Sequence, residues 1–143
     1  MTTKESPLYY LSRADARRVE KPWGYELIFA HTDHYVGKVL HIAAGLRLSR
    51  QYHVTKEETL MVGSGVMRVE LGTDTNLTEV EMGTGDVCHL PPGTVHRLMA
   101  VTDVDVIEVS TTQLEDVVRL EDDFGRTGSS LSQPAEVRPA HDA

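Results

Sequence analysis

Short runs of alternating apolar and polar residues, separated by Gly, Pro, Asp or Ser, fill the chain from Trp23 onward. Alternation with a period of two residues is the pattern of a half-buried strand. No stretch keeps a helical period long enough to supply the crossovers of a parallel sheet. Strands this short and this regularly spaced predict a single-domain, all-β sandwich or barrel. We predict strands at residues 25–30, 35–43, 46–53, 59–62, 66–71, 77–82, 87–90, 95–100 and 104–109.

The two ends of the chain differ from this pattern. Residues 1–20 are mixed and polar, and their second half, residues 14–20, is weakly helical or an extended arm. Residues 115–119 form one helical turn or a final strand. Beyond Phe124 the composition turns to Gly, Ser, Thr, Pro and Ala, which cannot bury enough apolar surface to order a segment. We therefore expect an N-terminal arm (1–20), a β-barrel (21–124) and a flexible tail (125–143).

Composition narrows the classes of partner. With 143 residues the chain forms one domain, and its net charge of −8 argues against a nucleic-acid partner. No apolar run approaches the roughly 20 residues that cross a bilayer, and no signal peptide is recognised. The single cysteine, Cys88, cannot form an internal disulfide, so we expect a cytoplasmic protein. Because N-terminal arms often cover the sheet edge of a neighbouring subunit, we also expect a homodimer.

Two segments, 45–58 and 85–96, carry candidate metal ligands. Residues two apart on a strand share a face, so Gln51 and His53 project together. Glu58 follows at the start of the next strand, and His96 follows a Pro-Pro-Gly turn. Two imidazoles and a carboxylate suit a first-row divalent ion, and an amide oxygen is a weaker fourth ligand. We predict one ion (Zn, Fe, Mn, Co or Ni) bound by Gln51, His53, Glu58 and His96, and we interpret the remaining strand histidines as ordinary core or surface residues: His31, His34, His41 and His89.

The spacing of these residues resembles the two motifs of the cupin superfamily. The residues that fill the motifs are Gly45, Gln51, His53, Glu58 and Gly65 in the first, and Gly85, Pro91, Gly93 and His96 in the second. Gln51 stands where most metal-binding cupins have a histidine, and here the chain is similar to the type II mannose-6-phosphate isomerase branch. Residues 21–24 (Lys-Pro-Trp-Gly) and 116–126 look like the opening and closing segments of that branch. The resemblance implies a double-stranded β-helix (cupin or jelly-roll) barrel of two antiparallel sheets, with the metal inside one open end.

The resemblance also implies an activity, an aldose–ketose isomerase acting on a phosphorylated sugar. The metal would bind the carbonyl and neighbouring hydroxyl oxygens, and a general base would move the proton. Lys56 and Glu57 are the nearest candidates for that base, with solvated turn residues as the alternative. Arg47 and Ser49 share the inward parity of the ligands and could meet the phosphate, although Arg47 could equally face water at the rim. Arg119, in the closing segment, is a third candidate.

Two other functions stay open at this point. Where the isomerase branch has further histidines, an arginine and a His-Trp pair, this chain has Val54-Thr55-Lys56-Glu57 and then Thr59-Leu60. The site could therefore serve an oxygenase, lyase or epimerase acting on another small molecule. A non-enzymatic cupin that binds a small ligand is the third possibility. In each case the expected partner is a small molecule.

Overall fold

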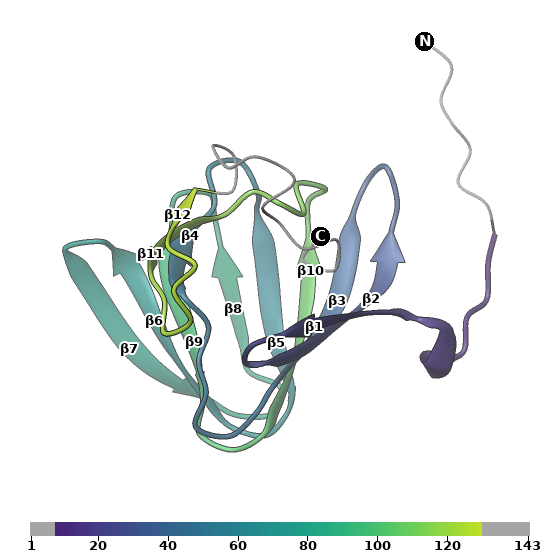
Figure 1. Cartoon of the computed structure of the whole chain (residues 1–143), viewed down its shortest axis with the longest axis horizontal. Helices are drawn as coiled ribbons and strands as arrows, with labels where there is room; N and C mark the ends of the chain where they lie inside the picture. The colour runs from purple at the N-terminus through teal and green to yellow at the C-terminus, as the bar shows by residue number, and fades with distance from the viewer. Residues whose placement is uncertain (1–7, 130–143) are drawn as a thin grey trace, which may run out of the picture.

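The computed structural model describes residues 8–129, and in this range twelve strands form two antiparallel six-stranded sheets (Figure 1). The first sheet has the order β1-β2-β3-β10-β5-β8, and the second has the order β12-β11-β4-β9-β6-β7. In chain order the strands are β1 (Arg17–Lys21), β2 (Gly24–His31), β3 (Val36–Ile42), β4 (Arg50–Tyr52), β5 (Glu58–Ser64), β6 (Met67–Thr73), β7 (Asn76–Met82), β8 (Val87–Leu90), β9 (Val95–Ala100), β10 (Val104–Ser110), β11 (Val118–Glu121) and β12 (Gly128–Ser129).

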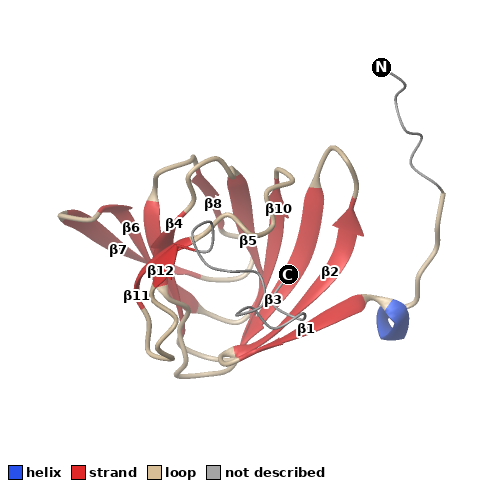
Figure 2. Cartoon of the chain, turned by 45° about the horizontal axis from the view of Figure 1, so that its top comes forward, coloured by secondary structure: helices blue, strands red, loops and turns tan. Residues whose placement is uncertain are grey.

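This arrangement confirms the predicted all-β cupin barrel. Figure 2 shows that strands make up nearly all of the regular structure, with one short 3-10 turn, η1 (Arg13–Asp15), before β1. Between residues 8 and 129, no helix has the length and apolar character that crossing a bilayer requires. The two sheets face one another, and buried side chains from both of them form one hydrophobic core.

The inward stripe of each central strand changes from apolar to polar along its length. In β10, Val104 and Val106 are fully buried in the core, whereas Glu108 faces the same way nearer the other end. The register places Leu40 opposite Val106 and Lys38 opposite Glu108, so β3 makes the same change at the same level. We call the end that carries these charged residues the polar end of the barrel. The core at the other end stabilises the fold, since each large buried apolar side chain contributes about 1.5–3 kcal/mol.

The ends of the chain are more ordered than the sequence predicts. Residues 17–20, the end of the expected arm, form β1 together with Lys21 and pair with β2 of the same chain. Of residues 115–119, expected as one helical turn or a final strand, only 118 and 119 belong to a strand, β11, which continues to Glu121. The expected tail begins with β12, which pairs with β11, while residues 130–143 lie outside the described range.

Two internal elements also differ from expectation. The predicted strand 46–53 is reduced to β4 (Arg50–Tyr52) plus an isolated bridge between Arg47 and Met99. β5 and β6, expected as neighbours joined through residues 63–65, lie in different sheets. Gly65 allows this crossing because its φ is +87° and a Cβ there would lie 2.2 Å from the carbonyl oxygen of Asp103.

Candidate metal centre

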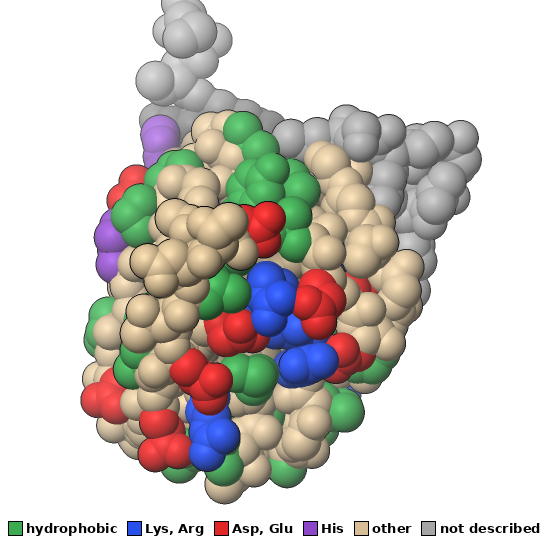
Figure 3. Space-filling model, turned by 90° about the vertical axis from the view of Figure 1, so that its left-hand side faces the viewer, with side chains coloured by type: hydrophobic (Ala, Val, Ile, Leu, Met, Phe, Trp, Pro, Cys, Tyr) green, Lys and Arg blue, Asp and Glu red, His purple; other side chains and the backbone are tan. Residues whose placement is uncertain are grey.

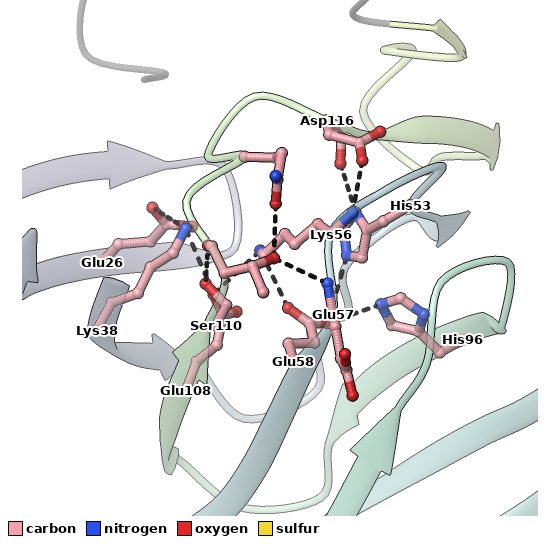
Figure 4. Close-up of polar contacts among 12 residues, drawn as sticks. Glu26, Lys38, His53, Lys56, Glu57, Glu58, His96, Glu108, Ser110 and Asp116 are labelled. Carbon is pink, nitrogen blue, oxygen red and sulfur yellow. Dashed lines mark hydrogen bonds and ion pairs between the residues drawn. The ribbon is translucent and has the colours of Figure 1, made fainter. Parts of the chain in front are cut away.

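Three predicted ligands meet at the polar end of the barrel (Figure 4). His53 follows β4, Glu58 begins β5, and His96 lies in β9. The Nε2 atoms of both histidines lie 3.3 Å from Oε1 of Glu58, and all three side chains are buried. The structure therefore brings together residues that are separated by up to 43 positions in the sequence (96 − 53).

Hydrogen bonds fix the tautomer of both imidazoles. Nδ1 of His53 donates to the backbone carbonyl of Asp116, and Nδ1 of His96 donates to the carbonyl of Thr94 at 2.9 Å. A carbonyl oxygen can only accept, so in a neutral ring Nδ1 carries the proton and the Nε2 lone pair faces Glu58. Two lone pairs and a carboxylate oxygen so close together repel one another unless a proton or a metal cation lies between them.

A divalent metal ion fits this donor set. Ligand atoms held about 2.0–2.1 Å from a tetrahedral ion are separated by about 3.3–3.4 Å along each edge of the tetrahedron. The two nitrogen–oxygen distances of 3.3 Å match that edge. Imidazole and carboxylate are also the ligands that first-row ions prefer. The three residues that would hold the ion are thus His53, Glu58 and His96.

Gln51 lies next to this group on β4, paired in register with His96. Its Oε1 atom accepts a hydrogen bond from the buried hydroxyl of Ser49 at 2.6 Å. An amide oxygen has two lone pairs, so this bond leaves one for a further partner. The role of Gln51 as a fourth metal ligand stays a prediction.

Lys56 connects the three candidate ligands to a chain of buried charges (Figure 4). Its ammonium lies 3.0 Å from Glu58 Oε2 and 3.1 Å from Glu108 Oε2. Lys38 lies 3.9 Å from the same Glu108 oxygen and 3.3 Å from Glu26. All five side chains are at most 10% exposed, which is rare for charged residues unless they are paired. Sequence reasoning missed Glu26, Lys38 and Glu108 because they lie outside the two motifs. Each is a charged residue among the apolar, inward-facing positions of its strand, and this pattern could have identified them.

Burial and pairing act against each other on the pKa values of these groups. Burial works to raise the pKa of Glu58, but the ammonium of Lys56 acts against it, and that pKa lies well below its usual value. Burial works to lower the pKa of Lys56, but Glu108 and Glu58 raise it above its usual value. Burial and the charge of Glu58 raise the pKa of Glu108 despite the two lysines. At neutral pH Glu58 is therefore ionised and Lys56 is a cation.

A small cavity opens beside the metal ligands. Its volume is about 70 Å³, which is room for a few water molecules. His53, Lys56, Glu58 and Glu108 line it, and so does Arg119, the predicted phosphate contact on β11. Three further cations among the lining residues were missed by the sequence reasoning, and these are Lys21, Lys38 and Arg126.

The structure does not bring the other predicted site residues into this cavity. Glu57 is half-exposed on the outer surface, where its carboxylate lies 2.9 Å from Nε2 of His89. Arg47 makes a bidentate ion pair with Asp123 at 2.7 and 2.8 Å. This pair belongs to a cluster of ion pairs on the outer face of the second sheet, and Figure 3 shows acidic and basic side chains side by side on this side of the molecule. Ser49 is buried, and its hydroxyl donates a hydrogen bond to Gln51 rather than lining the cavity.

Comparisons with known proteins agree with the fold and the motifs. A family model described as "Mannose-6-phosphate isomerase C-terminal" matches residues 12–122. The chain is 34% identical over 116 residues to the mannose-1-phosphate guanylyltransferase ManC of Salmonella typhimurium, covering 77% of this chain and 23% of the relative. It is 30% identical over 116 residues to the xanthan biosynthesis protein XanB of Xanthomonas campestris, covering 78% and 24%. The chain thus spans about a quarter of the length of these relatives.

Solved structures show the same fold at low sequence identity. A cupin-superfamily sugar phosphate isomerase from Silicibacter pomeroyi superimposes with a TM-score of 0.63 and 18% identity, covering 78% of this chain and 81% of that one. Oxalate decarboxylase from Bacillus subtilis superimposes with a TM-score of 0.68 and 15% identity, covering 81% and 33%. These similarities establish the cupin architecture and leave the reaction open.

Proposed function

The chain belongs to the mannose-6-phosphate isomerase C-terminal family of cupins, and from this premise we propose that it is a metal-dependent aldose–ketose isomerase acting on a phosphorylated sugar. The observation that carries the proposal is the buried group of His53, Glu58 and His96, which borders a cavity lined by both carboxylates and cations. A divalent ion held there would act as a Lewis acid toward the carbonyl and neighbouring hydroxyl oxygens of an open-chain sugar. Proton transfer and phosphate binding would be carried out by side chains of this protein.

Proton transfer is assigned to Lys56 and Glu108. Because the pKa of Lys56 is raised, its ammonium is a hydrogen-bond donor and a source of positive charge rather than a base. Glu108 accepts a hydrogen bond from Lys56 at 3.1 Å and lines the cavity, and burial raises the pKa of its carboxyl, which favours its taking up a proton. We leave Glu57 out of this chemistry because its side chain lies on the outer surface.

Phosphate binding is assigned to Arg119 and the neighbouring cations Lys21 and Arg126. Ligand pockets usually have volumes of about 300–1,000 Å³, whereas this cavity has about 70 Å³. Only the reacting end of a sugar phosphate would enter it, which leaves the phosphate at the mouth. Arg47 and Ser49 do not line the cavity and are left out of the proposed phosphate site.

An assay with defined metal content tests the proposal. The purified chain is loaded in turn with Zn²⁺, Mn²⁺, Co²⁺, Ni²⁺ and Fe²⁺, and its metal content is measured. Each form is incubated with mannose 6-phosphate and related aldose phosphates, and the ketose products are followed by proton NMR. We expect interconversion that disappears on chelation and in the His96→Ala variant. Stoichiometric metal without turnover of any sugar phosphate would contradict the isomerase proposal.

A second candidate is a metal-dependent oxygenase or lyase acting on a molecule smaller than a hexose phosphate. The observation that favours it is the small volume of the cavity, about 70 Å³. Non-haem iron with open coordination positions activates dioxygen in sites of this type. Oxygen uptake by the iron-loaded protein in the presence of small organic acids would favour this function over isomerisation.

A further inference from the structure

Asp116 joins the segment before β11 to the loop that carries two of the three metal ligands. Its carboxylate accepts hydrogen bonds from three consecutive backbone N–H groups, those of Val54 at 3.0 Å, Thr55 at 2.6 Å and Lys56 at 2.8 Å. The residue is buried, with 5% of its surface exposed. Hydrogen bonds to an ionised acceptor are roughly twice as strong as neutral ones. One side chain thus binds three of the four residues between His53 and Glu58.

The same residue orients the first ligand. The backbone carbonyl of Asp116 accepts the Nδ1 proton of His53, which keeps the Nε2 lone pair directed at Glu58. The backbone carbonyl of Asp116 therefore orients the ring of His53, and the side chain of Asp116 fixes the loop that follows His53. Burial works to raise the pKa of Asp116, but the three backbone N–H groups lower it below its usual value, so the carboxylate stays ionised.

We propose that Asp116 is a positioning residue that assembles the metal centre before the ion binds. It holds the 53–58 loop in the conformation that sets Glu58 against the two imidazoles, and it fixes the tautomer of His53. The inference rests on the proposed metal site but not on the reaction carried out there. Replacing a residue that hydrogen-bonds to a metal ligand and orients it typically weakens metal binding by about 10–100-fold.

The test compares Asp116→Asn with a matched control, Asp103→Asn. Asp103 also accepts a hydrogen bond from a backbone N–H group, that of Ala44 at 2.7 Å, but it serves a turn that carries no metal ligand. Zn²⁺ affinity is measured by competition with a chromophoric chelator, well below the melting temperature of each variant. We expect Asp116→Asn to bind Zn²⁺ about 10–100-fold more weakly and Asp103→Asn to match the unaltered protein. Equal Zn²⁺ affinity in all three proteins would overturn the proposal.

A second measurement separates positioning from general stability. In the ion-free protein at pH 8, the nitrogen chemical shifts of His53 should report a single form with the proton on Nδ1. In Asp116→Asn they should report a mixture of tautomers, and an unchanged single form would overturn the proposal. If Asp116→Asn does not fold, Asp116→Ser, which keeps a short acceptor, takes its place. If the unaltered protein binds no Zn²⁺, the proposed metal function fails, while the His53 tautomers still decide the role of Asp116.

Discussion

Replacing Lys56 by Met should reveal how far the metal centre depends on its buried ammonium. Lys56 separates the carboxylates of Glu58 and Glu108, and the three side chains are 4%, 3% and 6% exposed. Methionine fills a similar volume without charge, so two buried carboxyl groups would lose their shared cation.

The magnitude follows from the two ion pairs. At separations of 3.0 and 3.1 Å, each attraction is about 5 kcal/mol for an effective dielectric constant of about 20, before the cost of desolvation is subtracted. Removing one partner of a buried pair typically destabilises a protein by about 3–5 kcal/mol, because the remaining charge is left uncompensated. We expect the ion-free Lys56→Met variant to lose this much unfolding free energy. A bound divalent ion should restore part of it by supplying positive charge beside Glu58.

Urea unfolding followed by the fluorescence of Trp23 measures this effect, since Trp23 is the single tryptophan and is buried in the core. Lys56→Arg keeps the cation and should lose less stability than Lys56→Met. The double variant Lys56→Met/Glu108→Gln removes one unpaired carboxylate and should be more stable than Lys56→Met alone. A Lys56→Met variant within 1 kcal/mol of the unaltered protein, or a double variant that regains nothing, would refute the reasoning.

Three further predictions concern the metal content of ligand variants, the binding of the substrate phosphate and the stability of the protein in acid. His53→Ala and His96→Ala should lower the metal content most, Glu58→Gln less and Gln51→Ala least. Elemental analysis measures this content. Full metal content in all four variants would contradict the assignment of the site. Arg119→Ala should raise KM for a phosphorylated substrate about tenfold, since a hydrogen bond to a charged group contributes about 1.5–3 kcal/mol, and Arg47→Ala should leave KM unchanged. Because the pKa of Asp116 is lowered by folding, its contribution to stability is complete above the unfolded pKa of about 3.9 and is lost as the pH falls through the folded value. Urea unfolding from pH 5 to pH 2 should therefore show a smaller loss of stability for Asp116→Asn than for the unaltered protein.

The central strands and the convergence of three candidate ligands could be predicted because their signals are local. Alternation marks a strand within a few residues, and the spacing of His53, Glu58 and His96 follows the turns that join those strands. Strand parity also identified Glu58 rather than Glu57 as the inward residue. The same parity argument failed for Arg47, because the chain there makes only an isolated bridge and the guanidinium turns to Asp123.

The buried charges and the role of Asp116 depend on contacts that no local pattern encodes. Glu26, Lys38 and Glu108 come from three strands, and only the pairing of those strands brings them into one chain of charges that reaches Lys56 through Glu108. Asp116 meets the 53–58 loop across about 60 residues of chain. Homodimer formation and a cytoplasmic location stay predictions, and light scattering in solution tests the first of them.

The attachment of β11 has a consequence for how short a working version of this domain could be. Asp123, just beyond β11, accepts hydrogen bonds from Arg47 and from the fully buried Arg97. Asp116, just before β11, accepts hydrogen bonds from the 53–58 loop. A chain cut after Ser110 would keep ten strands, all three metal donors and the apolar core. It would nevertheless leave His53 without its carbonyl partner, so such a fragment should fold as a barrel that holds metal poorly.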